Sequence, residues 1–496
     1  MLRRLHNITR GMVLPGVVVL AISGMAQTSL GQCELVELLA SDGSQSDSFG
    51  ISVSISGGVG IIGARNDDAN GYASGSAYIF VQDGLSWIEQ AKLLASDGET
   101  YNYFGESVDV SGDVAIVGAR WNDEIGFHAG AAYVFRYTAD TNEWIEQAKL
   151  LASDGASQDE FGFAVAVSGD VAVVGAYSHD HGWNGSNVGG VYVFRSADGG
   201  RSWIQEAELL ASDGSPNDWF GNAVDIAGDR IIVGAYRNDV SGSNSGSAYI
   251  FRYYPKIGVW IEEIRLVPSD SEAGDWFGRH VAIDGEVCLV GATGDDDNGS
   301  NAGAAYVYRY DVGAAQWIEE AKLVASDGDS YDNFGPVAIE GNVVVVGAPK
   351  HDFPAINAGV AYVYTYDPAA ASWNEQGMLV ASDNAQYDEF GGAVAIDGGL
   401  VIAGARSHDD LGSSSGSAYV FDPLADTDVN NNGIPDACEP WLGDLNSDGV
   451  VNSADLIILL AFWGPCPPPP LECLGDLNAD EVVGVADLLI LLANWS

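Results

Sequence analysis

One pattern recurs seven times along this chain, in copies spaced about 57 residues apart. Each copy holds a Phe-Gly pair, an apolar run that ends in Gly-Ala, and a short segment with a central tyrosine. Six copies continue into a segment led by tryptophan. A unit repeated at this period cannot bury its apolar faces alone and must stack against its neighbours. The repeats therefore predict a propeller or a solenoid.

Each copy is expected to form four short strands. In the second copy these are residues 107–110, 114–117, 130–135 and 144–151. Ser111-Gly112 between the first two suits a tight hairpin with positive φ at the glycine. No copy carries an apolar stripe of helical period. The prediction is an all-β, seven-bladed β-propeller of four-stranded blades, in which small residues allow close packing near the central axis: Gly75, Gly130, Gly189, Gly246, Gly303, Gly359 and Gly416.

The two ends of the array predict how the ring closes. The seventh copy stops at Phe421 without a tryptophan-led fourth strand. The missing segment is found at the other end, where residues 34–40 match residues 90–95. We expect this N-terminal strand to complete blade seven, so that the propeller spans residues 34–421 and leaves no exposed sheet edge.

The Phe-Gly and Gly-Ala pairs resemble the FG-GAP repeats of integrin α-chain heads and of many secreted bacterial proteins. This resemblance covers residues 34–421 and implies an adhesion or ligand-recognition platform. Integrin-type repeats often hold calcium in an Asp-x-Asp-x-Asp-Gly loop between the first two strands. Here that connection is only Ser-Gly-Asp or similar, so calcium is not expected there.

The N-terminus has the pattern of a secretory signal. Arg3 and Arg4 precede an apolar stretch over residues 12–22, and Gly24-Met25-Ala26 forms a small-x-small cleavage site. The stretch is too short for a membrane span. Residues 1–26 are therefore expected to be a signal peptide, and the protein to be extracellular or associated with the cell surface. Residues 30–33 are similar to a lipoprotein box, which leaves the type of signal peptidase open.

Charge and cysteine content narrow the class of protein. The net charge of −50 argues against nucleic acid or an anionic membrane as partner. The chain is nevertheless 47% hydrophobic, so it is not an acidic disordered protein. Cys288 lies in an apolar strand and is expected to be a buried thiol. The pairing of the other cysteines cannot be read from the sequence: Cys33, Cys438, Cys466 and Cys473.

The C-terminal residues 442–496 contain a twice-repeated loop and helix. Residues 444–455 place oxygen atoms at the loop positions that a hard cation such as Ca²⁺ requires, with Gly449 at the sharp turn. Residues 476–487 repeat the pattern, but Glu481 replaces the turn glycine and Gly484 offers no side chain. The expected calcium ligands are Asp444, Asn446, Asp448, the carbonyl of Val450, Asn452 and Asp455 in the first loop, and Asp476, Asn478, Asp480, the carbonyl of Val482 and Asp487 in the second.

These two loops, each followed by an apolar helix, resemble the paired F-hands of a type I dockerin. The resemblance implies a small α-helical calcium domain that docks onto a cohesin-like partner. In that family loop positions 10 and 11 contact the partner, and they correspond here to Ser453, Ala454, Val485 and Ala486. The alternative is that both loops serve only folding and have no partner.

The connector, residues 422–441, is acidic. Its Asp-x-Asp-x-Asn spacing is similar to the calcium loops of thrombospondin type 3 repeats. That resemblance implies further calcium ligands, and the alternative is a polar flexible linker: Asp426, Asp428, Asn430, Asn432 and Asp436.

Three acidic positions recur in the propeller repeats, and they are expected to cap loop amides and form Asx-turns. The alternative is a ring of cation sites on one face. One set follows Gly-Ala: Asp68, Asp123, Asp180, Asp239, Asp296, Asp352 and Asp409. A second precedes Phe-Gly: Asp47, Asn102, Asp159, Asp218, Asp275, Asp332 and Asp388. The third lies in a Ser-Asp turn: Asp42, Asp97, Asp154, Asp213, Asp270, Asp327 and Asp383. The neighbouring His179, His351 and His408 permit transition-metal binding but are expected to be exposed loop residues.

No catalytic motif breaks the repeats, although abundant carboxylates leave a glycosidase-like pair open. We therefore expect no enzyme and no catalytic residue, but a secreted binding or scaffold protein with a protein or glycan ligand on the propeller. The alternative is an accessory or catalytic component of an extracellular polysaccharide-degrading complex. A deep pocket at the axis, lined by tryptophan and carboxylates, would favour that alternative.

Overall fold

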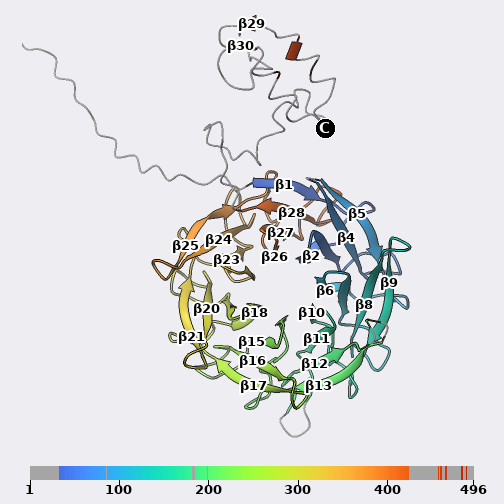
Figure 1. The fold of residues 1–496 in the computed structure, drawn as a ribbon, viewed down its shortest axis with the longest axis vertical. Coiled ribbons are helices and arrows are strands. Elements are labelled where there is room, and N and C mark those ends of the chain that lie inside the picture. The colour runs from blue at the N-terminus through green and yellow to red at the C-terminus, as the bar shows by residue number, and fades with distance from the viewer. Residues whose placement is uncertain are drawn as a thin grey trace, which may run out of the picture.

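The computed structural model of the protein describes residues 33–423, except 85, 181–184, 198 and 201, together with residues 456, 459, 460, 464, 465, 482, 483 and 488. Seven four-stranded antiparallel sheets stand as blades around a central axis (Figure 1). This arrangement confirms the predicted seven-bladed propeller.

The blades follow one another along the chain. Blade one comprises β2 (Phe49–Ser56), β3 (Val59–Ala64), β4 (Ser76–Asp83) and β5 (Ser86–Leu93). Blade two comprises β6 (Phe104–Ser111), β7 (Val114–Ala119), β8 (Ala131–Thr138) and β9 (Glu143–Leu150). Blade three comprises β10 (Ala164–Ser168), β11 (Val171–Ala176), β12 (Gly190–Arg195) and β13 (Ile204–Leu209). Blade four comprises β14 (Val224–Ala227), β15 (Arg230–Ala235), β16 (Ser247–Tyr254) and β17 (Val259–Leu266).

The remaining blades have the same order of strands. Blade five comprises β18 (Phe277–Asp284), β19 (Val287–Ala292), β20 (Ala304–Asp311) and β21 (Gln316–Leu323). Blade six comprises β22 (Val337–Glu340), β23 (Val343–Ala348), β24 (Val360–Asp367) and β25 (Ser372–Leu379). Blade seven comprises β26 (Ala393–Asp397), β27 (Leu400–Ala405), β28 (Ser417–Asp422) and β1 (Cys33–Leu38). Two short strands, β29 (Gly464–Pro465) and β30 (Val482–Val483), pair with each other.

The N-terminal strand closes the ring as predicted. β1 pairs antiparallel with β28, with Glu37 opposite Tyr419, and the sheet order is β1-β28-β27-β26. Leu38 is only 2% exposed. Because β1 covers the edge of β28, the outer strand of blade seven comes from the opposite end of the propeller sequence.

The apolar core lies between neighbouring blades rather than inside any one of them. One cluster joins Ile61 and Leu93 of blade one to Phe104, Val117 and Tyr133 of blade two. The ring of Phe104 meets the ring of Tyr133 edge-to-face at a centroid distance of 5.5 Å, a favoured geometry for buried aromatic pairs. Each Phe-Gly pair therefore lies at the interface with the preceding blade, and we call such an interface between neighbouring blades a seam.

The recurring glycines serve these seams, which corrects the expectation that they lie near the axis. Gly75 forms a parallel bridge with Phe104 of the next blade, and a Cβ added to it would overlap the Phe104 backbone. Its φ of +84° also favours glycine. The axis is lined instead by the first strand of each blade, from β2 to β26.

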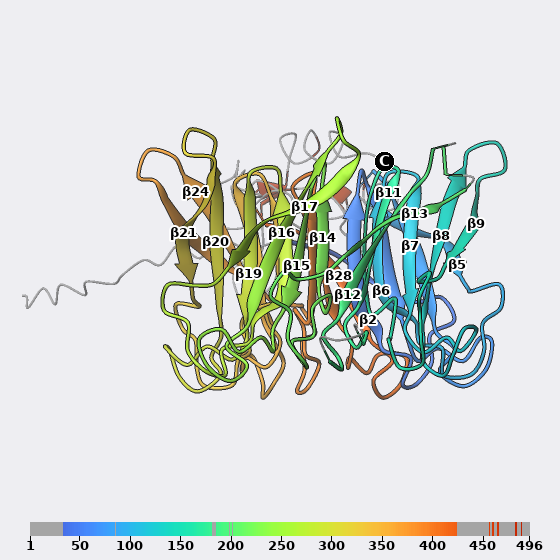
Figure 2. The same cartoon turned by 90° about the horizontal axis from the view of Figure 1, so that it is seen from below.

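The connections place turns and loops on opposite faces of the propeller (Figure 2). Two-residue hairpins such as Gly112-Asp113, with φ +59° at the glycine, lie on one face, which we call the hairpin face. Longer segments such as residues 65–75 and 94–103 lie on the other, which we call the loop face. Cys288 is fully buried as predicted, and burial raises the pKa of its thiol. The described residues contain no helix of the length and apolarity that a bilayer crossing requires.

Candidate functional site

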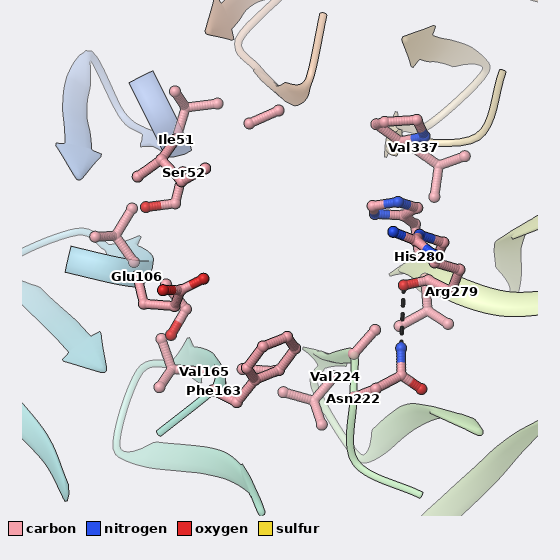
Figure 3. Close-up of a pocket in the computed structure, with 18 of the residues that line it drawn as sticks. Ile51, Ser52, Glu106, Phe163, Val165, Asn222, Val224, Arg279, His280 and Val337 are labelled. Atoms are coloured by element: carbon pink, nitrogen blue, oxygen red, sulfur yellow. Dashed lines mark hydrogen bonds between the residues drawn. The ribbon is translucent and has the colours of Figure 1, made fainter. Parts of the chain in front are cut away.

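An axial cavity of about 350 Å³ opens toward the loop face of the propeller (Figure 3). Its rim is built from the residue that follows each Phe-Gly pair, so the repeat brings seven equivalent positions together around one opening. Unlike the Phe-Gly pairs themselves, these positions differ in every blade: Ile51, Glu106, Phe163, Asn222, Arg279, Pro336 and Gly392. A ligand site of defined shape and charge needs such a departure from sevenfold symmetry.

A chain of aromatic rings crosses blades three and four beside this opening. Phe163 packs on Tyr177 at a centroid distance of 4.5 Å, and Tyr177 packs on Trp219 at 4.9 Å. Trp219 in turn meets Tyr236 edge-to-face at 5.5 Å. Phe163 and Tyr236 line the cavity. The rings therefore form a contiguous stack that joins two walls of the cavity through the buried Tyr177.

Arginine side chains lie over these rings. The guanidinium carbon of Arg237 is 3.5 Å from the ring centroid of Trp219, and that of Arg279 is 5.3 Å from Tyr236. Arg120 lies 5.5 Å from Phe163. These distances are within cation–π range. We call the set the arginine–aromatic patch: Arg120, Phe163, Tyr177, Trp219, Tyr236, Arg237 and Arg279.

The arginines of the patch differ in their ion pairs. Arg120 lies 3.3 Å from Glu106 and 3.5 Å from Glu160, so its charge is balanced within the protein. Among the residues that the structure describes, Arg237 and Arg279 take part in no ion pair. The whole chain has 70 acidic residues and 20 lysines and arginines. Two arginines without carboxylate partners in such a chain keep their charge available for an anionic ligand.

His280 lies next to Arg279 in the wall of the channel. Its ring is partly open to the lumen, but protein surrounds it closely. Burial, and then the charge of Arg279, lower its pKa to about 3. The imidazole is therefore neutral at physiological pH and can donate or accept a hydrogen bond without adding charge.

The hairpin end of the channel is acidic. Asp109 accepts the hydroxyl of Ser54 and the N–H of Val167, both at 2.6 Å, and so links three blades. Burial raises its pKa to about 6. Asp225 accepts the N–H of Ile283 at 2.7 Å, and burial, followed by the charge of Asp109, raises its pKa to about 7. The two ends of the channel thus differ in charge: the carboxyl groups of Asp109 and Asp225 lie toward the hairpin face, and the guanidinium of Arg279 lies toward the loop face.

The recurring acidic positions bond groups within the propeller repeats: the first two sets cap loop amides as expected, whereas the third bonds tyrosine hydroxyls, which was not predicted. The set after Gly-Ala accepts loop N–H groups at 2.5 to 2.9 Å, from Ala73, His128, Asn187, Asn244, Asn301, Asn357 and Ser414. The set before Phe-Gly accepts N–H groups three residues upstream at 2.6 to 2.9 Å. The third set accepts the hydroxyls of buried tyrosines at 2.6 to 2.9 Å, from Tyr78, Tyr133, Tyr192, Tyr249, Tyr306, Tyr362 and Tyr419.

The expectation that three histidines are exposed loop residues is wrong. His179, His351 and His408 are 5%, 8% and 5% exposed. Each occupies the position that Asp67 occupies in blade one, close to the buried tyrosine of its own blade. The acidic residues around them are typical of exposed loops, but each imidazole is buried beside the tyrosine of its own blade.

The predicted calcium ligands and partner contacts of the C-terminal region lie outside the described residues, with one exception. Val482 belongs to β30, where it pairs with Pro465. The predicted ligands and contacts outside the described residues are Asp444, Asn446, Asp448, Val450, Asn452, Asp455, Asp476, Asn478, Asp480, Asp487, Asp426, Asp428, Asn430, Asn432, Asp436, Ser453, Ala454, Val485 and Ala486. The signal peptide, residues 1–26, also lies outside them.

Comparison with known proteins gives one family. The family model described as FG-GAP repeat matches residues 34–80, 87–135, 144–194, 203–251, 260–308, 317–364 and 373–421. Each match runs from the fourth strand of one blade to the third strand of the next, so the sequence repeat spans a seam. No curated protein matches the chain. A crystal structure of a protein from Lactobacillus plantarum is similar at 15% identity and a TM-score of 0.44, over 70% of this chain and 88% of that one, a likeness too distant to bear on function.

Proposed function

The chain belongs to the FG-GAP repeat family, and from this premise we propose that it is a secreted, non-catalytic binding protein that recognises an anionic ligand at the arginine–aromatic patch. One observation carries the proposal. Arg237 and Arg279 lie on aromatic rings beside the axial opening and have no ion pair among the described residues, although the chain is strongly acidic.

The composition of the patch favours an acidic glycan as the ligand. Guanidinium groups bind carboxylate and sulfate through paired, charge-assisted hydrogen bonds. Aromatic faces such as that of Trp219 supply flat apolar area at little conformational cost. An anionic protein segment satisfies the same guanidinium groups, so an array must carry both glycans and proteins.

A binding array with the full chain tests this proposal. We expect binding to carboxylated or sulfated glycans that weakens as ionic strength rises, because charged groups contribute to it. The double variant Arg237→Ala/Arg279→Ala should lose at least tenfold in affinity. Arg252→Ala is the matched control, since Arg252 pairs with Asp229 at 3.0 Å on the hairpin face. Equal binding by the double variant and the wild type would contradict the proposal.

The C-terminal residues 442–496 are proposed to attach the protein to a cohesin-like partner. Two loops with oxygen-bearing residues at calcium-loop spacing support this proposal. Pull-down of a cohesin module by the full chain, in Ca²⁺ and in chelator, is the test. Binding that is equal in both solutions would contradict a calcium-dependent dock.

The alternative is an accessory or catalytic component of a polysaccharide-degrading complex. Among the described residues, the cavity at the loop face is lined by one carboxylate, Glu106, and by no tryptophan. Glu106 is also ion-paired with Arg65 at 2.9 Å. This lining supports binding over hydrolysis. Release of reducing sugar from acidic polysaccharides by wild type, but not by Glu106→Gln, would favour the enzyme instead.

A further inference from the structure

Blade seven contains a cluster of one histidine and three carboxylates: Glu37, Asp383, His408 and Asp410. One ligand atom from each lies within 4.8 Å of all the others. The Nε2 atom of His408 is 3.2 Å from Asp410 Oδ1, 3.6 Å from Asp383 Oδ2 and 4.0 Å from Glu37 Oε1. The cluster thus converges on a single nitrogen.

That nitrogen is buried and has no hydrogen-bond partner among the described residues. His408 is only 5% exposed. Its other ring nitrogen, Nδ1, lies 2.8 Å from Asp388 Oδ2. When Nδ1–H donates to Asp388, the Nε2 lone pair faces the three carboxylates. A carboxylate behind a histidine is the usual way in which proteins orient a metal-binding imidazole.

Hydrogen bonds also hold two of the carboxylates in place. The hydroxyl of Tyr419 donates to Asp383 Oδ1 at 2.8 Å, which leaves Oδ2 facing His408. The hydroxyl of Ser417 donates to Glu37 Oε1 at 2.8 Å, and this is the same oxygen that lies 4.0 Å from Nε2 of His408. Asp410 lies in an exposed loop. The cluster is therefore largely preorganised, with one adjustable member.

The repeat itself supplies an internal comparison. In blade five Lys322 lies opposite Tyr306 in the sheet, and its Nζ is 2.9 Å from Asp270, 2.8 Å from Asp295 and 2.5 Å from Asp297. In blade seven Glu37 lies opposite Tyr419 in the same register. In blade seven the carboxylate of Glu37 thus stands where blade five has the ammonium of Lys322. The imidazole of His408 stands where blade five has the buried carboxylate of Asp295.

We propose that blade seven binds a divalent transition cation of the Zn²⁺ class between Glu37, Asp383, His408 and Asp410. Tetrahedral Zn²⁺ with bonds of about 2.0 to 2.2 Å separates its ligands by about 3.3 to 3.6 Å. The distances from Nε2 to Asp410 and Asp383, 3.2 and 3.6 Å, are close to this separation, and Glu37 at 4.0 Å would have to approach slightly. An imidazole nitrogen favours Zn²⁺ over Ca²⁺. Because Glu37 comes from β1 and the other ligands from residues 383–410, the ion would fasten the N-terminal strand to the seventh blade.

Zinc titration of the full chain tests the site. All proteins carry Glu208→Lys, because Asp154, His179 and Glu208 form a related cluster in blade three. After removal of metal, excess Ca²⁺ is added to fill oxygen-only sites. We expect calorimetry to show one Zn²⁺ fewer for Glu37→Lys, which puts an ammonium at the position that Lys322 has in blade five. Zn²⁺ should raise the melting temperature of the parent protein, which carries Glu208→Lys alone, but not that of the Glu37→Lys variant.

Asp410→Asn provides a second variant that leaves the strands untouched. It should weaken the same Zn²⁺ event at least tenfold while the unliganded protein melts as the parent does. The proposal is overturned if the parent binds no Zn²⁺, since a protonated His408 is then the resident cation, or if neither variant changes Zn²⁺ binding. Binding on the glycan array should not change in either variant, which separates this site from the arginine–aromatic patch.

Discussion

Gly404 of blade seven lies against Gly50 of blade one so closely that a Cβ on Gly404 would overlap the Gly50 carbonyl oxygen. The same contact joins Gly63 to Gly105 and recurs at each of the other five seams. The Gly-Ala pair of one blade thus receives the Phe-Gly pair of the next. The first and last blades therefore meet through the same contact as every other neighbouring pair, which explains why both dipeptides recur in all seven copies.

Gly404→Ala should weaken the seam between blades seven and one. The added methyl group has no space, and overpacking of this kind costs about 1 to 3 kcal/mol. The free energy of unfolding, measured with urea, should fall by that amount. Gly313→Ala is the control, because Gly313 lies in an exposed turn where a Cβ meets only the Asp311 carboxylate. Equal stability of the two variants would argue against the seam contact.

Loss of the N-terminal strand should open the ring. Deletion of residues 34–40 uncovers β28, and an unpaired edge strand is prone to pair with another molecule. We expect aggregation and loss of cooperative thermal melting. As a milder test, Leu38→Ala should cost about 2 to 5 kcal/mol, whereas Ile204→Ala on an outer strand, at 67% exposure, should cost little. A truncated chain that melts like the wild type would disprove closure by β1.

The blades could be predicted from the sequence, but the arginine–aromatic patch could not. Phe-Gly and Gly-Ala recur at fixed spacing, so the number of blades and the role of residues 34–40 could be predicted. Arg237 and Arg279 are 42 residues apart, and only the curvature of the ring brings their blades together at one opening. Comparison of the copies would have shown that the residue after Phe-Gly varies in every blade. The burial of His408 could not be predicted, because its neighbours Asp409 and Asp410 are typical of solvent-facing loops.

The two loops of the C-terminal region should bind calcium unequally. The first has five oxygen-bearing side chains and a turn glycine, whereas the second has four and carries Glu481 at the turn. A non-glycine residue there costs on the order of 1 kcal/mol if the turn needs positive φ. In calorimetric titration of the full chain, Asp444→Ala should remove the tighter Ca²⁺ event and Asp476→Ala a weaker one. Two equal events would contradict this ranking.

Asp225 should make the propeller less stable as pH rises. Burial and the charge of Asp109 raise its folded-state pKa from 3.8 to about 7. Well below pH 3.8 both the folded and the unfolded chain hold the proton, so the stability that this carboxyl contributes is fully present. Between pH 4 and 7 the unfolded chain releases the proton first, and the free energy of unfolding falls. Above pH 7 that contribution is lost.

Urea unfolding of wild type and Asp225→Asn across pH 4 to 8 measures this effect. Asparagine cannot accept both N–H groups that Asp225 accepts, from Ile226 and Ile283, and that loss shifts the curve by an amount independent of pH. The difference between the two proteins should therefore change with pH, by on the order of 1 to 2 kcal/mol in favour of the variant. Asp140→Asn, on an exposed turn, controls for the lost charge. Parallel curves for wild type and Asp225→Asn would show that the carboxyl at the acidic end of the channel does not hold its proton in the folded protein.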